Sequence, residues 1–181
     1  MPDPDLVERL DLLPRRSLSA VTYRHVSQGR QPLSGEGARI QGGRWNPAES
    51  FPTLYVGLSE DVVVAEFRRL ALRSGRSTAD FLPRELYRID VTLQLVLDLT
   101  VGTTVQALDV EGADLISDDL VTCQAVGDAA HYLGAEAILA PSAAGPGSAL
   151  AIYTDRLQPG SVLIPHLLGQ WDVAAAVPQT N

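Results

Sequence analysis

Apolar and polar residues recur with two different periods along the chain, and these periods predict a mixture of strands and helices. Between residues 85 and 99 apolar side chains stand at every second position, which predicts a half-buried strand. Within 60–73 the apolar residues follow a helical spacing, after Ser59, whose side chain can cap the first turn. A second long helix is predicted over 117–134, with Ser117 as its cap.

Shorter segments complete the expected order of elements. We expect strands at 18–26 and 53–58, and a strand, loop and strand within 135–155. Short helices are expected at 4–12 and 103–109. The segment 160–168 is expected to form a last edge strand, which Pro165 ends. Strands and helices follow one another without a regular βαβ alternation, which favours an α+β fold over a doubly wound sheet. Residues 27–53 are rich in Gly, Pro, Ser and Gln, and a loop of this length inside a compact domain usually carries function.

The composition limits the class of protein. The 181 residues are 45% hydrophobic and 20% charged and contain no obvious linker, so we expect one globular domain. We expect a loose leader over 1–16, the domain itself over 17–168 and a tail over 169–181. No stretch has the length of a signal-peptide core or a membrane span, which favours a cytoplasmic protein without membrane contact.

The charge and the rare residue types exclude several kinds of chemistry. With a net charge of -8 the chain is a poor non-specific ligand for nucleic acid, so a local cluster of cations must hold any anionic ligand. All 14 basic residues are arginine, and the lack of lysine excludes a Walker A loop and a lysine Schiff base. The single Cys123 excludes an internal disulfide and a cysteine-based zinc site, and the histidines lack metal-ligand spacing, so we expect no metal.

Several side chains in the first part of the chain have both a structural and a functional interpretation. Arg24 lies inside a predicted strand, where it either reaches solvent at a sheet edge or faces a ligand. In the loop QGGRWNPAES, Trp45 either packs the loop onto the core or braces it so that Arg44 points at an anion. Tyr55, within a short apolar strand, is either a core aromatic or a flat surface for another ring.

Two further candidates lie later in the sequence. Glu66 borders the apolar face of its predicted helix, so that it either faces a cavity or pairs with Arg69 or Arg73 on the surface. Ser142 follows the apolar run AILAP and is either a turn residue or a hydrogen-bond partner of a substrate.

Taken together, these residues resemble the RES domain, a family named for an arginine, a glutamate and a serine. The motifs that carry the resemblance are Tyr23-Arg24, GGRWN at 42–46, LYVGLSEDVVVAEF at 54–67 and ILAPSA at 138–143. The resemblance runs from Ser17 to Leu168, although the span 98–117 carries no motif. It assigns the three naming residues to Arg24, Glu66 and Ser142, and it places the family's loop arginine at Arg44 and its aromatic at Tyr55.

The resemblance implies a function, a fold and a partner. RES proteins are toxins of bacterial toxin–antitoxin pairs, resemble ADP-ribosyltransferases in fold and consume NAD. That fold implies twisted mixed or antiparallel sheets flanked by helices. The partner implied is an Xre-type helix-turn-helix antitoxin that blocks the active site, so DNA would be reached only through the antitoxin. A homodimer within the complex is left open.

NAD chemistry gives each candidate residue a role within this resemblance. Arg24 and Arg44 would hold the pyrophosphate, because a guanidinium matches phosphate oxygens two at a time. Trp45 would brace the loop behind Arg44, and Tyr55 would stack on the nicotinamide. The catalytic candidates are Arg24, Tyr55 and Glu66.

Glu66 would stabilise the positive charge that develops on the ribose as the nicotinamide leaves. Nicotinamide departs as a neutral group, so no general acid is needed. Ser142 would bind either the nicotinamide amide or a ribose hydroxyl. The acceptor stays open, because water gives hydrolysis, phosphate gives phosphorolysis and a protein side chain gives ADP-ribosylation. We rank NAD degradation first and protein ADP-ribosylation second; the alternative of another class is a non-catalytic module that binds a nucleotide or a partner, with Glu66 at its surface.

Overall fold

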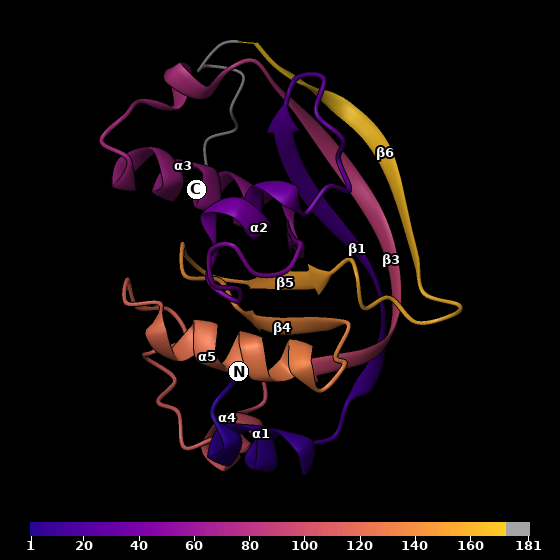
Figure 1. Cartoon of the computed structure of the whole chain (residues 1–181). Coiled ribbons are helices and arrows are strands. Elements are labelled where there is room, and N and C mark those ends of the chain that lie inside the picture. Colours follow the sequence, from indigo (N-terminus) through magenta and orange to yellow (C-terminus); the bar gives the residue numbers. More distant parts are fainter. Residues whose placement is uncertain (173–181) are drawn as a thin grey trace.

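The computed structural model describes residues 1–172 of the chain (Figure 1). Its helices are α1 (Pro4–Asp11), α2 (Glu36–Gln41), α3 (Glu60–Arg73), α4 (Gly102–Ala107) and α5 (Val121–Tyr132), with a 3-10 turn at Thr78–Phe81. Its strands are β1 (Arg16–Ser27), β2 (Thr53–Gly57), β3 (Arg84–Asp98), β4 (Ala137–Pro141), β5 (Ser148–Tyr153) and β6 (Val162–Trp171).

The strands form one sheet that closes on itself. Neighbouring strands follow the order β1-β2-β5-β4-β3, and β1 also pairs with β3, so that these strands make a closed barrel to which β6 adds at β3. The β3–β4 pair is parallel and the other pairs are antiparallel. The β1–β2 junction is narrow, with Tyr23 opposite Gly57. The α+β class expected from the sequence is therefore confirmed, and the sheet is a mixed barrel.

Side chains that alternate along the strands form two separate cores, one inside the barrel and one on its outer face. Leu54 and Val56 of β2 face the inside of the barrel, where they join the buried residues of β3 such as Ile89. Tyr55 lies between them and points to the outer face, because successive strand residues point to opposite sides. There it packs against the cluster that lies under α5. The expected alternation over 85–99 is confirmed by the buried residues of β3.

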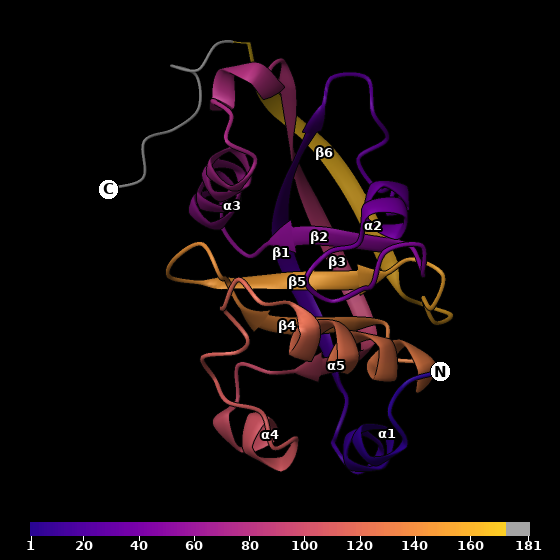
Figure 2. The same cartoon turned by 60° about the vertical axis from the view of Figure 1, so that its left-hand side comes forward.

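Two helices cover different parts of the barrel's outer face. The cluster that contains the buried residues of α5 also contains outward residues of β4 and β5, together with Leu10 of α1. Helix α3 packs separately, with Phe67 against Leu86 and Trp171. In Figure 2, α3 and α5 lie on opposite sides of β2 and β5. The outer face of β2 is therefore bordered by both helices, and the candidate site lies there.

A buried carboxylate fixes the start of β4. The side chain of Glu136 is fully buried, and it accepts hydrogen bonds from the backbone N–H groups of Gln94 (2.5 Å), Leu95 (2.7 Å) and Gln158 (2.8 Å). Burial by itself would raise the pKa of Glu136, but these donors lower it below its ordinary value. The Glu136 carboxylate thus accepts hydrogen bonds from backbone N–H groups near the point along β3 at which its pairing changes from β6 to β4.

Two sequence expectations about element ends were wrong. The second long helix begins at Val121 rather than near Ser117, and the Val121 N–H donates to the Asp119 carboxylate. The Ser117 hydroxyl instead donates to backbone carbonyls, so it caps nothing. Strand β6 also continues through Pro165 to Trp171, because an edge strand tolerates a missing N–H where that position faces away from its neighbour.

The chain ends and the long loop also differ from expectation. The first 16 residues are not loose, because α1 buries Leu6 and Leu10 in the core. The loop at 27–53 contains the short helix α2. The expected tail begins within β6, and its residues 173–181 lie outside the described part of the chain. No helix within residues 1–172 has both the length and the apolar character that a membrane crossing requires.

Candidate functional site

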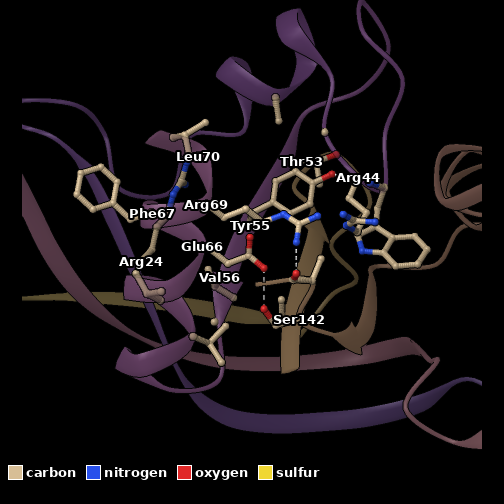
Figure 3. A pocket seen from close by; sticks show the side chains of 18 of the residues that line it. Arg24, Arg44, Thr53, Tyr55, Val56, Glu66, Phe67, Arg69, Leu70 and Ser142 are labelled. Carbon is tan, nitrogen blue, oxygen red and sulfur yellow. Dashed lines mark hydrogen bonds between the residues drawn. The ribbon is translucent and has the colours of Figure 1, made fainter. Parts of the chain in front are cut away.

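A cavity of about 660 Å³ opens on the outer face of β2 between α3, the end of α2 and the loop that follows β4 (Figure 3). Its volume is in the range of small-molecule and cofactor sites. The residues proposed from the sequence all line it: Arg24, Arg44, Trp45, Tyr55, Glu66 and Ser142. These residues come from segments far apart in the sequence, so the closure of the barrel brings them together.

The most direct link between them joins Glu66 and Ser142. Ser59 caps α3 by accepting from the Val62 N–H, and the helix then turns Glu66 into the cavity. The Ser142 hydroxyl donates to Glu66 Oε1 at 2.7 Å, drawn as a dashed line in Figure 3. The Ala144 N–H donates to the same hydroxyl at 3.1 Å, which leaves the Ser142 proton directed at the carboxylate. Ser142 is thus more than a turn residue, because it orients Glu66.

Tyr55 has a hydroxyl that is fully used by the loop before it. The hydroxyl accepts from the Trp45 N–H and donates to Asn46 Oδ1, each at 2.8 Å. Burial raises the pKa of Tyr55 well above its ordinary value. At Gly43 a Cβ would lie 2.5 Å from the Tyr55 hydroxyl oxygen, so the loop can approach the ring only because this residue is glycine. Tyr55 therefore offers a fixed ring rather than an acid or a base.

Trp45 serves as the anchor of the GGRWN loop. Its side chain is 3% exposed and belongs to the core cluster that packs under α5. Its carbonyl lies so close to Gly127 of α5 that a Cβ there would overlap the oxygen. Asn46 is also buried, and its Nδ2 donates to the Ala38 carbonyl of α2 at 2.7 Å. The loop is thus fixed to both neighbouring helices.

Arg44 leaves this fixed loop toward the segment before α5. Its Nη1 donates to the Leu115 carbonyl at 3.1 Å and its Nη2 to the Ser117 carbonyl at 2.9 Å. Nη1 also lies 3.8 Å from Cys123 Sγ, and the Cys123 side chain is buried in the core. Arg44 is therefore not a solvent-exposed residue, and it ties the GGRWN loop to the segment before α5.

Arg24 is held in a similar way on the other side. Its Nη1 donates to the carbonyls of Pro32 (2.7 Å) and Ser34 (3.0 Å). Burial first, and the positive charge of Arg84 second, lower the pKa of Arg24 to about 10, so the group keeps its charge at neutral pH. A guanidinium has five N–H donors, which leaves donors of Arg24 for a ligand.

Sequence reasoning considered Arg69 and Arg73 only as surface partners of Glu66 and missed that both line the cavity. Arg69 and Arg73 line the cavity, and both contact Asp118 rather than Glu66. The surface ion pair considered for Glu66 is therefore not formed. The spacing of three and seven residues from Glu66 along one helix could have placed both arginines on its face.

The cavity concentrates positive charge in an acidic chain, and its lining contains the carboxylate of Glu66. Such a site suits an anionic ligand that develops a positive centre beside the carboxylate. No group of three or more His, Cys, Asp or Glu side chains within residues 1–172 could hold a metal ion.

Comparisons with known proteins identify the family of the chain. A protein-family model described as RES domain matches residues 18–174. The chain is 39% identical over 163 residues to the NAD(+) phosphorylase MbcT of Mycobacterium tuberculosis, across 88% of this chain and 87% of that protein. It is 35% identical over 154 residues to a probable NAD(+) phosphorylase of the same organism, across 84% of this chain and 73% of that protein.

A solved structure is similar over nearly the whole chain. It is a chain of the crystal structure of the M. tuberculosis MbcT-MbcA toxin-antitoxin complex, with 36% sequence identity and a TM-score of 0.82. The match covers 96% of this chain and 94% of that one.

Proposed function

Because the chain belongs to the RES domain family, we propose that it cleaves the bond between nicotinamide and ribose in NAD and transfers the ADP-ribosyl group to inorganic phosphate. The observation that carries this proposal is the carboxylate of Glu66, which Ser142 holds in a cavity lined by arginine side chains. The names of the relatives support phosphate as the acceptor.

The chemistry balances without a cofactor. The C–N bond breaks, and its electron pair goes to the pyridinium nitrogen, which leaves as neutral nicotinamide. A phosphate oxygen then bonds to the same ribose carbon, and the products are nicotinamide and an ADP-ribose phosphate. The transition state resembles an oxocarbenium ion, so an anion beside the ribose lowers the barrier. Glu66 supplies that charge, and Ser142 orients it.

The remaining candidates bind the substrate in this proposal. Arg24 and Arg44 hold the pyrophosphate with the N–H donors that their backbone contacts leave available. Tyr55 offers the flat face on which the nicotinamide stacks, and Trp45 holds the loop that carries Arg44. In affinity measurements Arg24→Lys should weaken the binding of NAD but not that of nicotinamide riboside, which lacks the pyrophosphate.

We also propose that the chain is the toxin of a toxin–antitoxin pair, because the similar M. tuberculosis structure is that of a toxin–antitoxin complex. An Xre-type antitoxin would cover the cavity, which is bordered by the Gly-rich segment 35–43 and the small-residue loop 141–149. Inhibition of nicotinamide release by the purified partner should weaken as NAD rises. Cytoplasmic location, a domain over 17–168 and likeness to the ADP-ribosyltransferase fold belong to the same proposal.

The purified chain, incubated with NAD with and without phosphate, tests the proposed reaction. Nicotinamide and the ADP-ribose product are separated by chromatography, and ³¹P NMR distinguishes ADP-ribose from its phosphate ester. We expect nicotinamide release that rises with phosphate and yields the ester. Free ADP-ribose independent of phosphate would indicate a hydrolase. Label from NAD on cellular protein would indicate an ADP-ribosyltransferase, and binding of NAD without any nicotinamide release would indicate a non-catalytic module.

A further inference from the structure

Arg69 and Arg73 converge on a single exposed carboxylate at the edge of the cavity. Arg69 Nη2 lies 2.5 Å from Asp118 Oδ1, and Arg73 Nη1 lies 3.5 Å from the same oxygen. The Asp118 side chain is 75% exposed, and it belongs to the irregular segment before α5. Both arginines line the cavity, whereas Asp118 is not among its lining residues. The carboxylate thus neutralises the cations from the solvent side.

The pair of Arg69 and Arg73 lies next to the carboxylate proposed to stabilise the transition state. Glu66 and Arg69 are one helical turn apart on α3, which places their Cβ atoms about 5–6 Å apart. They also contact consecutive residues of one loop, since Ser142 donates to Glu66 and Arg69 donates to the Ala143 carbonyl. Figure 3 shows the Glu66 carboxylate and the Arg69 guanidinium turned toward the middle of the cavity. An anion on the arginine pair would therefore lie close to a ribose bound beside Glu66.

We infer that Arg69 and Arg73 form the subsite for inorganic phosphate, the acceptor, and that Asp118 occupies their donors until phosphate arrives. This rests on the proposed phosphorolysis. Phosphate carries roughly two negative charges and several acceptor oxygens, so it outcompetes a single carboxylate for two guanidinium groups. Asp118 can move into solvent at little cost, because exposed ion pairs contribute little to stability.

The alternative source of a phosphate group at these arginines is the pyrophosphate of NAD. The positions of the cations favour the free anion. Arg24 and Arg44 reach the cavity from β1 and the GGRWN loop, whereas Arg69 and Arg73 belong to the helix that carries Glu66. An acceptor must reach the ribose carbon next to Glu66, so phosphate is expected on the helix that carries this residue.

Steady-state kinetics at saturating NAD and varied phosphate test the subsite. Arg73→Gln should raise the KM for phosphate about tenfold, since it removes a charge-assisted contact from a partly exposed site. Asp118→Asn should lower that KM about threefold, because it removes the competing anion. The KM for NAD should stay within about twofold in both variants. These opposite shifts cannot both come from a damaged fold.

The matched control is Arg88→Gln. Arg88 pairs with Asp90 on β3 and is 44% exposed, against 46% for Arg73, but it does not line the cavity. It should leave both KM values unchanged. If Arg73→Gln raises the KM for NAD as much as that for phosphate, the pair binds the pyrophosphate and the inference is wrong. If neither KM changes in Arg73→Gln and Asp118→Asn, the pair has only a structural role.

A direct binding measurement separates this inference from the proposed function. Calorimetric titration of inorganic phosphate into the chain without NAD should give a dissociation constant that rises about tenfold in Arg73→Gln and falls about threefold in Asp118→Asn. If the wild-type chain forms no phosphate ester, but the two variants shift the dissociation constant for phosphate as expected, the proposed reaction is wrong and the phosphate subsite stands. Equal phosphate binding in the wild-type chain and both variants overturns the subsite, whatever the reaction.

Discussion

Replacing Glu66 by glutamine tests the centre of the mechanism with the smallest change in shape. The glutamine carbonyl oxygen can still accept from the Ser142 hydroxyl, so the hydrogen bond of 2.7 Å has a replacement and only the charge is lost. At about 4 Å and an effective dielectric constant of about 20, a full unit charge interacts by about 4 kcal/mol. The ribose carries part of such a charge in the transition state, so about 3–4 kcal/mol is an upper range. We expect kcat to fall about 10²–10³-fold.

Initial rates of nicotinamide release at saturating phosphate, over a range of NAD concentrations, separate kcat from KM. The KM for NAD should change far less than kcat, because the positive charge of ground-state NAD is spread over the nicotinamide ring and moves onto the ribose only in the transition state. Glu60→Gln is the control, since Glu60 lies exposed in the first turn of the same helix. A Glu66→Gln enzyme that keeps kcat within about threefold of the wild-type value would refute the electrostatic role.

Three further predictions concern the site and the buried contacts that support the fold. Ser142→Ala should lower kcat about tenfold in the wild-type enzyme, and by less than about twofold in the Glu66→Gln variant, because the hydroxyl acts through the Glu66 carboxylate. Equal losses in the two backgrounds would mean that the hydroxyl acts on the substrate directly. Gly127→Ala would place a Cβ in overlap with the Trp45 carbonyl oxygen, so chemical denaturation should show a loss of about 1–3 kcal/mol in the free energy of unfolding, and an unchanged value would contradict the tight contact. Glu136→Gln should lower the free energy of unfolding by about 2–3 kcal/mol at neutral pH. Because the folded-state pKa of Glu136 is lowered, its contribution to stability is present above the ordinary pKa of 4.5 and is lost as the pH falls through the folded-state pKa. The difference in the free energy of unfolding between variant and wild type should therefore close on acidification. A difference independent of pH would argue against the lowered pKa.

The position of the cavity depends on the alternation of side chains along β2, which the sequence displays, and on the packing of α3 and α5 around this strand, which it does not display. Tyr55 faces the site because Leu54 and Val56 face the barrel interior, and this follows from the strand period. Whether that outer face is covered by a helix or open to a ligand depends on where α3 and α5 pack. Their packing is fixed by contacts over long sequence separations, such as the carbonyl of Trp45 against Gly127.

Helix ends show why local rules fail at this site. The sequence Ser117-Asp118-Asp119 offers three side chains that could cap a helix, and local preference does not choose among them. In the fold the Ser117 hydroxyl donates to backbone carbonyls, the Asp118 carboxylate pairs with Arg69, and Asp119 accepts from the Val121 N–H. Arg69, a cation from another segment, thus helps to decide which of the three side chains lies at the start of α5.

The sequence by itself determined the strand and helix periods, the Ser59 cap and the residue types of an anion site with a carboxylate, because these depend on neighbours within a few positions. Only the tertiary structure decided that the Ser142 hydroxyl donates to Glu66, 76 residues earlier, and that Arg69 contacts Ala143 and Asp118 rather than Glu66. The physical reason is that a side-chain donor or a charge takes whichever partner the folded chain brings within hydrogen-bonding distance. Closure of the barrel through the β1–β3 pair sets those distances, and no local pattern encodes them.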